Sequence, residues 1–269
     1  MKLHRVFPKR VRTSVLNVVS WGRSLLNYRL LNTKRLYAWP EIQHLRKLFG
    51  RFSVDCVFDI GANKGQYATM LRREVGYRGR IISFEPDPIA VLALTAAAQN
   101  DNSWEVHNIA VADRCGQVRL NIMRDSQFNS LNSPRYDETY ECSEANQVIE
   151  QVDVPAKTLL EVLTAAVESG PCQRPFLKMD TQGFDMSIVA ACPGCLSNFV
   201  GVQSEVAFKR LYQSAMHATD VLHWYSKHDF DVSAIVANNE GHFPLLVESD
   251  FIFVRRDLAT AIGERDSAS

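Results

Sequence analysis

The 269-residue sequence lacks any uninterrupted apolar stretch long enough for a signal peptide or a membrane span, which takes about 20 residues. It also contains no internal repeat and no low-complexity tract. With 13 Gly, 10 Pro and 6 Cys, it has too little of each for a collagen-like, disordered or disulfide-scaffold protein. These absences favour a globular protein, which we expect to be cytoplasmic.

The net charge is zero, but the charges are unevenly distributed. Residues 1–52 hold twelve Lys and Arg and a single acid, Glu41, so this part carries +11 and residues 53–269 carry −11. We therefore divide the chain into a basic N-terminal extension (1–52), a main domain (53–257) and a C-terminal tail (258–269).

The extension has apolar residues at helical spacing after Pro8. They are Val11, Val15, Val18, Val19, Leu25 and Leu26. A basic amphipathic helix can lie on an anionic membrane surface, so peripheral contact with the inner face of the membrane is one hypothesis. The alternative is a helix that packs on the domain and exposes its bases to water. Nucleic acid is not expected as a partner, because no base-reading module accompanies these bases.

One Cys-x-x-Cys motif, Cys192-Pro-Gly-Cys195, has the spacing of redox and zinc sites. A structural zinc site takes four ligands, and the sequence has no second pair of this kind. We interpret the Pro-Gly as a helix end followed by a turn, and expect all the cysteines to be thiols in a reducing compartment.

From Cys56 onward, short runs rich in β-branched residues alternate with helical patterns. This alternation predicts an α/β fold with a doubly wound, mostly parallel sheet. The predicted strands are 56–60, 80–84, 104–109, 117–122, 176–180, 199–205, 230–236 and 251–255, and the predicted helices are 66–75, 88–99, 159–168, 185–191 and 219–228. The polar segment 124–151 interrupts the pattern and is predicted to be an insertion loop, either a lid over a site or a flexible insertion.

A buried strand passes through a tight turn into a helix at residues 57–67, and this is the strongest functional signal. Gly61 and Gly65 allow the backbone to bend sharply and to approach a ligand, and Asn63 tolerates the left-handed conformation better than other side chains. The sequence therefore predicts a ligand-binding turn.

Two carboxylates suggest which ligand the turn binds. Glu85 ends the next predicted strand, where a carboxylate accepts hydrogen bonds from the ribose hydroxyls of a nucleotide-type ligand. Asp59 lies in the first strand just before the turn, where it suits the ammonium group of S-adenosylmethionine and would repel a pyrophosphate. The alternative is that Asp59 only caps the local turn. Together, Glu85 and Asp59 favour S-adenosylmethionine, a methyl donor, over a ligand with a pyrophosphate.

Six stretches resemble the FkbM-type family of S-adenosylmethionine-dependent methyltransferases, many of which methylate hydroxyls of sugars and other natural products. They are residues 58–65, 84–88, 108–111, 177–185, 203–206 and 250–254, in family order. The resemblance implies a class I methyltransferase-like Rossmann fold.

The resemblance also implies that Asp59, Gly61, Asn63, Gly65 and Glu85 line the methyl donor, with Asn108 near the adenine. The family usually has Asp-x-Glu-Gly-x-Glu where this chain has the segment 180–185, Asp-Thr-Gln-Gly-Phe-Asp. Gln182 and Asp185 therefore stand where the family has glutamates.

An alcohol acceptor must lose its proton during methyl transfer. Asp180 and Glu205 end neighbouring predicted strands and should face the same crevice, so we predict Asp180 as the general base and Glu205 as its partner or as a substrate-orienting group. The alternative, in which the two carboxylates bind Mg²⁺ and lower the pKa of the hydroxyl, is weakened by Gln182 in place of an acid. We predict no resident metal.

His242, in the loop between the last two predicted strands, is a further candidate base, although a solvated loop histidine is the ordinary interpretation. The predicted acceptor is a small molecule or a lipid-linked sugar, specifically a sugar hydroxyl of a bacterial glycolipid or glycosylated natural product. The rivals are a membrane-docking module without catalysis and a nicotinamide-dependent oxidoreductase. The sequence disfavours the oxidoreductase, because it has neither a Tyr-x-x-x-Lys pair nor a Gly-x-Gly-x-x-Gly turn.

Overall fold

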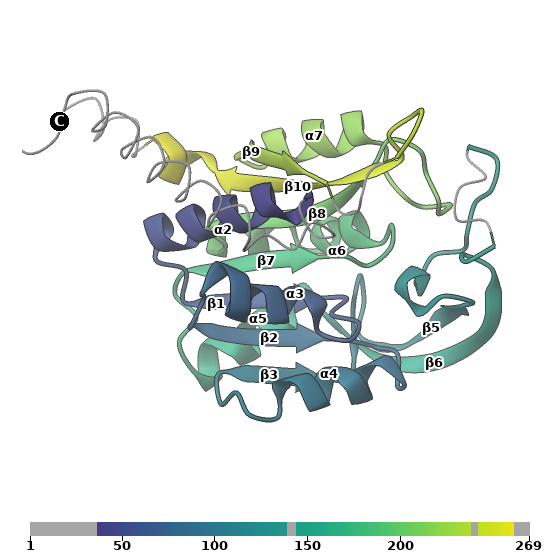
Figure 1. Ribbon diagram of the computed structural model, residues 1–269, viewed down its shortest axis with the longest axis horizontal. Coiled ribbons are helices and arrows are strands. Elements are labelled where there is room, and N and C mark those ends of the chain that lie inside the picture. Colours follow the sequence, from purple (N-terminus) through teal and green to yellow (C-terminus); the bar gives the residue numbers. More distant parts are fainter. Residues whose placement is uncertain (1–36, 139–143, 238–241, 261–269) are drawn as a thin grey trace, which may run out of the picture.

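A computed structural model describes residues 37–138, 144–237 and 242–260 (Figure 1). Within these residues a seven-stranded sheet has the order β3-β2-β1-β7-β8-β10-β9. Its strands are β1 (Cys56–Ile60), β2 (Arg80–Phe84), β3 (Trp104–His107), β7 (Pro175–Met179), β8 (Gly201–Ala207), β9 (Phe230–Val236) and β10 (Glu248–Arg255). All neighbours pair in parallel except β10, which is antiparallel to β8 and β9.

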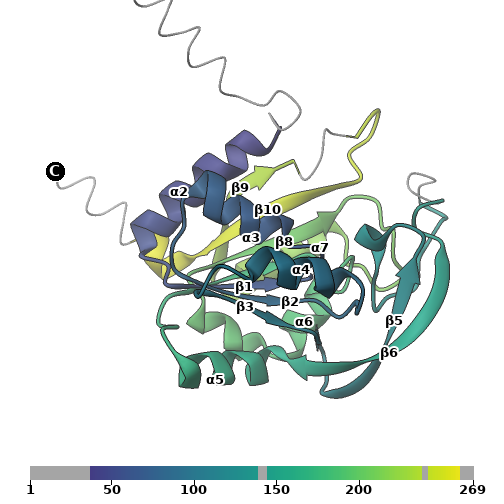
Figure 2. The same cartoon turned by 60° about the horizontal axis from the view of Figure 1, so that its bottom comes forward.

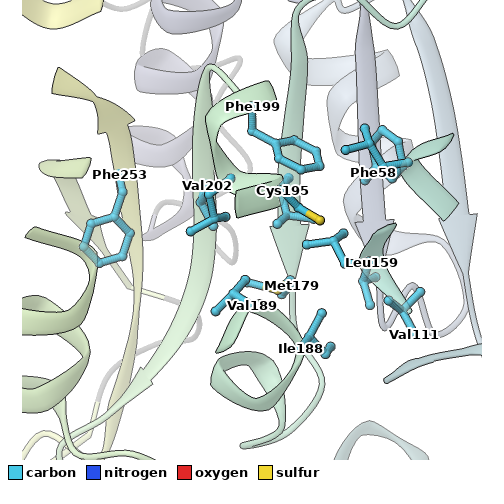
Figure 3. Close-up of a cluster of buried hydrophobic side chains, with 14 of the residues drawn as sticks. Phe58, Val111, Leu159, Met179, Ile188, Val189, Cys195, Phe199, Val202 and Phe253 are labelled. Carbon is cyan, nitrogen blue, oxygen red and sulfur yellow. The ribbon is translucent and has the colours of Figure 1, made fainter. Parts of the chain in front are cut away.

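Helices cover both faces of this sheet, which explains why β1 and β7 are buried along their whole length. One face carries α2 (Trp39–Phe52), α3 (Gln66–Met70) with its π-helical continuation η2 (Leu71–Val75), and α4 (Ala90–Ala98). The other face carries α5 (Leu159–Ser169), α6 (Asp185–Ala191) and α7 (Ala218–Lys227), and Figure 3 shows part of the core beneath them. The predicted doubly wound α/β class is confirmed, and the strand order reverses between β1 and β7, where such folds bind ligands.

A second, three-stranded sheet contains β4 (Ala110–Ala112), β5 (Gly116–Met123) and β6 (Val148–Thr158). The predicted strand 104–109 therefore extends too far, because the chain leaves the main sheet at the end of β3 and enters the second sheet at β4. Strand β6 was not predicted. Its first half is largely exposed and overlaps the polar segment 124–151, whereas Val154 and Ala156 of its second half are buried. The polar segment 124–151 also contains a short 3₁₀ turn, η3 (Ser126–Phe128).

Residues 39–52 of the basic extension form α2, which packs against the main sheet. Ile42, Leu45, Leu48 and Phe49 recur at helical spacing and are buried. Phe49 contacts Phe176 of β7 edge to face, with ring centroids 5.0 Å apart. The last part of the extension thus belongs to the core of the main domain. The predicted helical face from Val11 to Leu26, and residues 261–269 of the tail, lie outside the described residues.

The structure corrects one expectation about the cysteines. Cys192 and Cys195 form a disulfide, with their Cα atoms 5.5 Å apart. The helix α6 ends just before them, and Pro193 begins the 3₁₀ turn η4 (Pro193–Asn198), which brings the two side chains together. Cys56, Cys115 and Cys172 are thiols, and Cys142 lies outside the described residues.

No helix in the described part of the chain is both long and apolar enough to cross a bilayer.

The packing of α2 predicts a large effect of truncating Leu45, whose side chain is fully buried. We expect Leu45→Ala to lower the free energy of unfolding by about 2–5 kcal/mol, because it removes apolar contacts and leaves a cavity. Urea denaturation measures this value. Lys47→Ala, an exposed change on the same helix, is the control. Equal stability of the two variants would show that α2 does not pack on the sheet.

Candidate active site

A cavity of about 530 Å³ opens at the carboxyl ends of β1, β2, β7 and β8. The turn after β1 and the end of β2 form one part of its wall, and segment 126–131 closes over that part. The start of α2, the side chains of β8 and β10, and His242 form the other part. The arrowheads of the parallel strands in Figure 1 mark this side of the sheet.

The turn after β1 has the geometry that its glycines predict. Gly61 has φ 76° and lies so close to the chain after β7 that a Cβ atom would be 1.9 Å from the carbonyl oxygen of Asp180. Asn63 has φ 46° and lines the cavity. Gly65, with φ 84°, does not line the cavity; it allows α3 to pack closely on Leu94 and Trp104.

Glu85 ends β2 and lines the cavity, although only 6% of the residue is exposed. Its carboxylate accepts hydrogen bonds from the backbone N–H groups of Asn63, at 2.6 Å, and Asp87, at 2.8 Å. Burial raises the pKa of Glu85 to about 7, and these two hydrogen bonds counteract only part of that effect. Each carboxylate oxygen retains a lone pair, so Glu85 can still accept hydrogen bonds from a ligand.

The structure places Asp59 behind the cavity wall rather than in it. The side chain is fully buried, and its Oδ2 accepts a hydrogen bond from the Ser83 hydroxyl at 2.9 Å. Its Oδ1 has no hydrogen-bond partner among the described residues but lies 3.9 Å from the Lys178 Nζ. Burial raises the pKa of Asp59, and Lys178 and Ser83 offset this only in part. The expected direct contact of Asp59 with a ligand is therefore not visible in the cavity lining.

Asn108 does not line the cavity either. Its amide donates hydrogen bonds to the backbone carbonyls of Glu85, at 2.8 Å, and Pro86, at 3.2 Å. Asn108 thus holds the loop that presents Glu85, and its expected place near an adenine stays a prediction.

Asp180 and Glu205 are brought together as the sequence predicts, and Gln182 connects them. The Gln182 Nε2 donates to Asp180 Oδ1 and to Glu205 Oε2, each at 3.0 Å. The Tyr212 hydroxyl lies 2.9 Å from the Gln182 Oε1, which fixes the orientation of the amide. A glutamate at position 182 would place a third carboxylate beside these two, whereas the amide donates a hydrogen bond to each of them.

The second departure from the family pattern, Asp185, lies outside the cavity lining and is buried. It accepts hydrogen bonds from the backbone N–H and hydroxyl of Thr181 and from the Ser204 hydroxyl. Asp185 therefore connects the turn after β7 to β8.

Lys178 is the one lysine or arginine in the cavity lining of the described chain. Its Nζ lies 3.3 Å from Asp180 Oδ2 and 5.2 Å from the ring centre of Tyr67. Burial alone would lower the pKa of Lys178, but the carboxylates of Asp180, Asp59 and Asp250 outweigh it and raise the pKa. We therefore treat Lys178 as a permanent positive charge.

The part of the cavity farthest along the sheet is lined by residues that sequence reasoning did not assign. The Tyr67 hydroxyl donates to Gln203 Oε1 at 2.9 Å, and the Gln203 amide donates to Glu41 Oε1 at 2.8 Å. Asp250 pairs with Glu205 across β10 and β8. Glu41 could have been singled out in the sequence as the one acid of the basic extension. Asp250 and Gln203 could have been noticed because they lie inside stretches that resemble the family.

Several of these acidic side chains lie close together. Burial raises the pKa of Glu205 well above its usual value, and Glu248 and Asp180 nearby raise it further. Burial and the neighbouring Glu41 do the same for the pKa of Asp250, although Lys178 partly counteracts them. Among the described residues, no cluster of three or more His, Cys, Asp and Glu has the geometry of a metal site. His242 lines the same part of the cavity.

Residues 59–232 match the family model of the methyltransferase FkbM domain. This match spans more than half of the chain, which therefore belongs to the FkbM methyltransferase family. No protein of curated function matches the sequence.

Solved structures resemble the chain only distantly. A methyltransferase FkbM from Methylobacillus flagellatus KT is 15% identical, with a TM-score of 0.44; the match covers 74% of this chain but only 43% of that protein. A 1,6-didemethyltoxoflavin-N1-methyltransferase from Burkholderia thailandensis is 11% identical, with a TM-score of 0.43 and coverage of 94% and 93%. Fibrillarin from Aeropyrum pernix is 10% identical, with a TM-score of 0.42 and coverage of 74% and 66%.

The raised pKa of Glu85 predicts a pH dependence. The folded protein favours the protonated form of Glu85. The protonated carboxyl therefore stabilises the fold at low pH, and this stabilisation is lost as the pH rises through about 7. Ligand binding should change in the opposite direction, because the ionised carboxylate is the better hydrogen-bond acceptor for ribose hydroxyls. We expect calorimetry to show S-adenosylhomocysteine binding about tenfold or more tightly above pH 7 than below it.

Glu85→Gln should remove both pH effects and weaken binding at high pH. Glu168→Gln, which changes an exposed carboxylate of α5, should behave like the unmodified protein. If Glu85→Gln keeps the same affinity and pH dependence, Glu85 does not contact this ligand.

Proposed function

We propose that the protein transfers a methyl group from S-adenosylmethionine to a hydroxyl of a neutral sugar, carried by a glycolipid or a glycosylated natural product. The observation that carries the proposal is the bridge from Asp180 through Gln182 to Glu205 in the same cavity as the glycine turn and Glu85. One end of the cavity is suited to an adenosyl group and the other to the removal of a proton.

The residues at the first end fit S-adenosylmethionine. Glu85 offers carboxylate lone pairs to ribose hydroxyls, and Gly61 and Asn63 of the turn line the cavity. The Asn63 Oδ1 is a buried acceptor that no donor of the described chain satisfies, so it can receive a hydrogen bond from an ammonium group. When bound, this cofactor supplies a methyl group on a positively charged sulfur, which a nucleophilic oxygen displaces in line.

The contacts favour Glu205 as the general base, with Asp180 as the orienting group. Asp180 directs its two oxygens to Lys178 and Gln182. Burial raises the pKa of Glu205 well above its usual value, which makes its ionised form a stronger base than an ordinary carboxylate. Glu205 would accept the proton of the acceptor hydroxyl, while Gln182 holds the two carboxylates at a fixed separation. The sequence prediction gave these two roles in the opposite order.

The second end of the cavity suits a neutral, polyhydroxylated acceptor. Its polar groups, Glu41, Gln203, Glu205, Glu248 and Asp250, are mainly hydrogen-bond acceptors for hydroxyl groups. Its one lysine is already paired with Asp180, so a phosphorylated or carboxylated acceptor would find no further lysine or arginine in this lining. Tyr37 and Tyr67 add aromatic surface against which a sugar ring can pack.

Transfer of tritium from labelled S-adenosylmethionine to a panel of neutral glycolipids tests the proposal, with phosphorylated analogues as comparison. We expect transfer to a neutral member, and Glu205→Gln should lower kcat about 100-fold or more with a smaller effect on cofactor affinity. It should also remove the rise of kcat with pH, because the group that must lose a proton is gone.

Glu150→Gln, an exposed carboxylate of β6, is the matched control. Preferential transfer to the phosphorylated analogues would contradict the assignment of the acceptor. Full activity of the Glu205→Gln variant would contradict the assignment of the base.

A further inference from the structure

The turn after β7 holds Gln182 in a backbone conformation that few residues with long side chains adopt. Gln182 and Gly183 have φ 54° and 83°, so two consecutive residues are left-handed and one of them is not glycine. Such a residue is strained and keeps its conformation only where surrounding contacts hold it. In this conformation the Gln182 amide donates to both Asp180 and Glu205. The bridge between the two carboxylates therefore depends on the contacts that hold the turn.

Two of these contacts come from residues 126–132, which we call the closing segment. The Ser130 hydroxyl donates a hydrogen bond to the backbone carbonyl of Gln182 at 2.7 Å. The Asn132 side-chain amide donates to the backbone carbonyl of Gly183 at 2.8 Å. Ser130 and Asn132 are both buried, and the backbone N–H of Asn132 donates to the Ser130 hydroxyl at 2.9 Å. The closing segment thus bonds to the carbonyl of each left-handed residue.

The closing segment also contacts the end of the cavity that fits an adenosyl group. It follows β5, and Figure 2 shows this strand on the side of the main sheet to which β2 and β3 point. Residues 126–131 line the cavity, whereas Asn132 lies outside the lining. The Asn129 amide donates to Asp87 Oδ2 at 2.9 Å, and the backbone N–H of Asp87 donates to Glu85. One segment therefore contacts both the loop that presents Glu85 and the turn after β7.

We propose that Ser130 and Asn132 are positioning residues, which hold the Gln182 amide on the two carboxylates when the closing segment lies over a bound cofactor. A cofactor in the cavity stabilises this position of the segment, because residues 126–131 form part of the wall. The two hydrogen bonds then keep Gln182 left-handed and its amide directed at the carboxylates. Cofactor binding is thereby coupled to the geometry of the carboxylate pair, and such a coupling acts equally in both directions.

The inference deepens the proposed function, because it connects the cofactor end of the cavity to the end that removes a proton. It rests on that function for the roles of the two carboxylates in proton transfer. The coupling itself can be measured without an acceptor, by following the side-chain amide of Gln182 while S-adenosylhomocysteine binds.

Hydrogen exchange of the Gln182 side-chain amide, followed by NMR of protein that carries isotope-labelled glutamine, tests the coupling. The signal is assigned by its absence in the Gln182→Asn variant. We expect S-adenosylhomocysteine to slow this exchange in the unmodified chain. With saturating S-adenosylhomocysteine, exchange in Asn132→Ala should be about tenfold or more faster, because the Gly183 carbonyl loses its donor and the turn opens more often. Calorimetry should also show about fivefold or more weaker binding, although Asn132 does not line the cavity.

Ser130→Ala removes the donor to the Gln182 carbonyl and should have the same two effects, which keeps the test decisive if Asn132→Ala does not fold. Asn198→Ala is the matched control. The Asn198 amide also donates to a backbone carbonyl, that of Cys195 at 3.0 Å, but it lies in η4 and outside the cavity lining. This control should leave the exchange and the binding unchanged, and thermal unfolding shows which variants are folded.

Unchanged exchange of the Gln182 amide in folded Asn132→Ala or Ser130→Ala would overturn the inference. Weaker binding of S-adenosylhomocysteine without faster exchange would also overturn it, since a merely structural role of the segment gives that result. The proposed function would stand in both cases, because it requires only methyl transfer by the unmodified chain. Faster exchange in the variants, together with absence of transfer to every neutral glycolipid by the unmodified chain, would support the coupling and overturn the proposed function alone.

Discussion

The buried ammonium group of Lys178 is the interaction on which the site depends. It lies 3.3 Å from Asp180 and 3.9 Å from Asp59, in a region that also holds Glu205 and Asp250. Buried carboxylates without a compensating cation would strongly destabilise the fold or take up protons. Lys178, at the end of β7, offsets part of the free-energy cost of burying these carboxylates. It lies at the boundary between the two ends of the cavity.

The two ends of the cavity come from different parts of the fold. Turns after β1 and β2, at the place where the strand order reverses, build the end that fits an adenosyl group. The other end needs α2, which supplies Glu41 and is fixed by its apolar face against the sheet. Gln203 then connects Glu41 to Tyr67 of α3 through hydrogen bonds. A helix that precedes the main fold in the sequence is therefore part of the wall that an acceptor would meet.

The fold class and the turn after β1 could be predicted from the sequence, because both depend on local patterns: buried strands alternating with helices, and glycines at positions of positive φ. The closeness of Asp180 and Glu205 could also be predicted from the sequence, since neighbouring parallel strands end at the same edge of a sheet. Strand β6 was missed because its first half overlaps the polar segment 124–151, although Val152, Val154 and Ala156 alternate at strand spacing. The connecting amide of Gln182 could not be predicted, because a contact between a loop and a neighbouring strand leaves no periodic signal. Asp59 was placed on the correct strand, but sequence spacing does not show whether a carboxylate faces a cavity or the protein interior.

A crystal structure with bound S-adenosylhomocysteine would show directly where this ligand lies relative to Glu85, Asp180 and Glu205. We expect the ribose hydroxyls within hydrogen-bond distance of Glu85 and the sulfur directed toward the space beside Asp180 and Glu205. A ligand bound elsewhere, or one lying along the turn with its sulfur directed away from these two carboxylates, would contradict it.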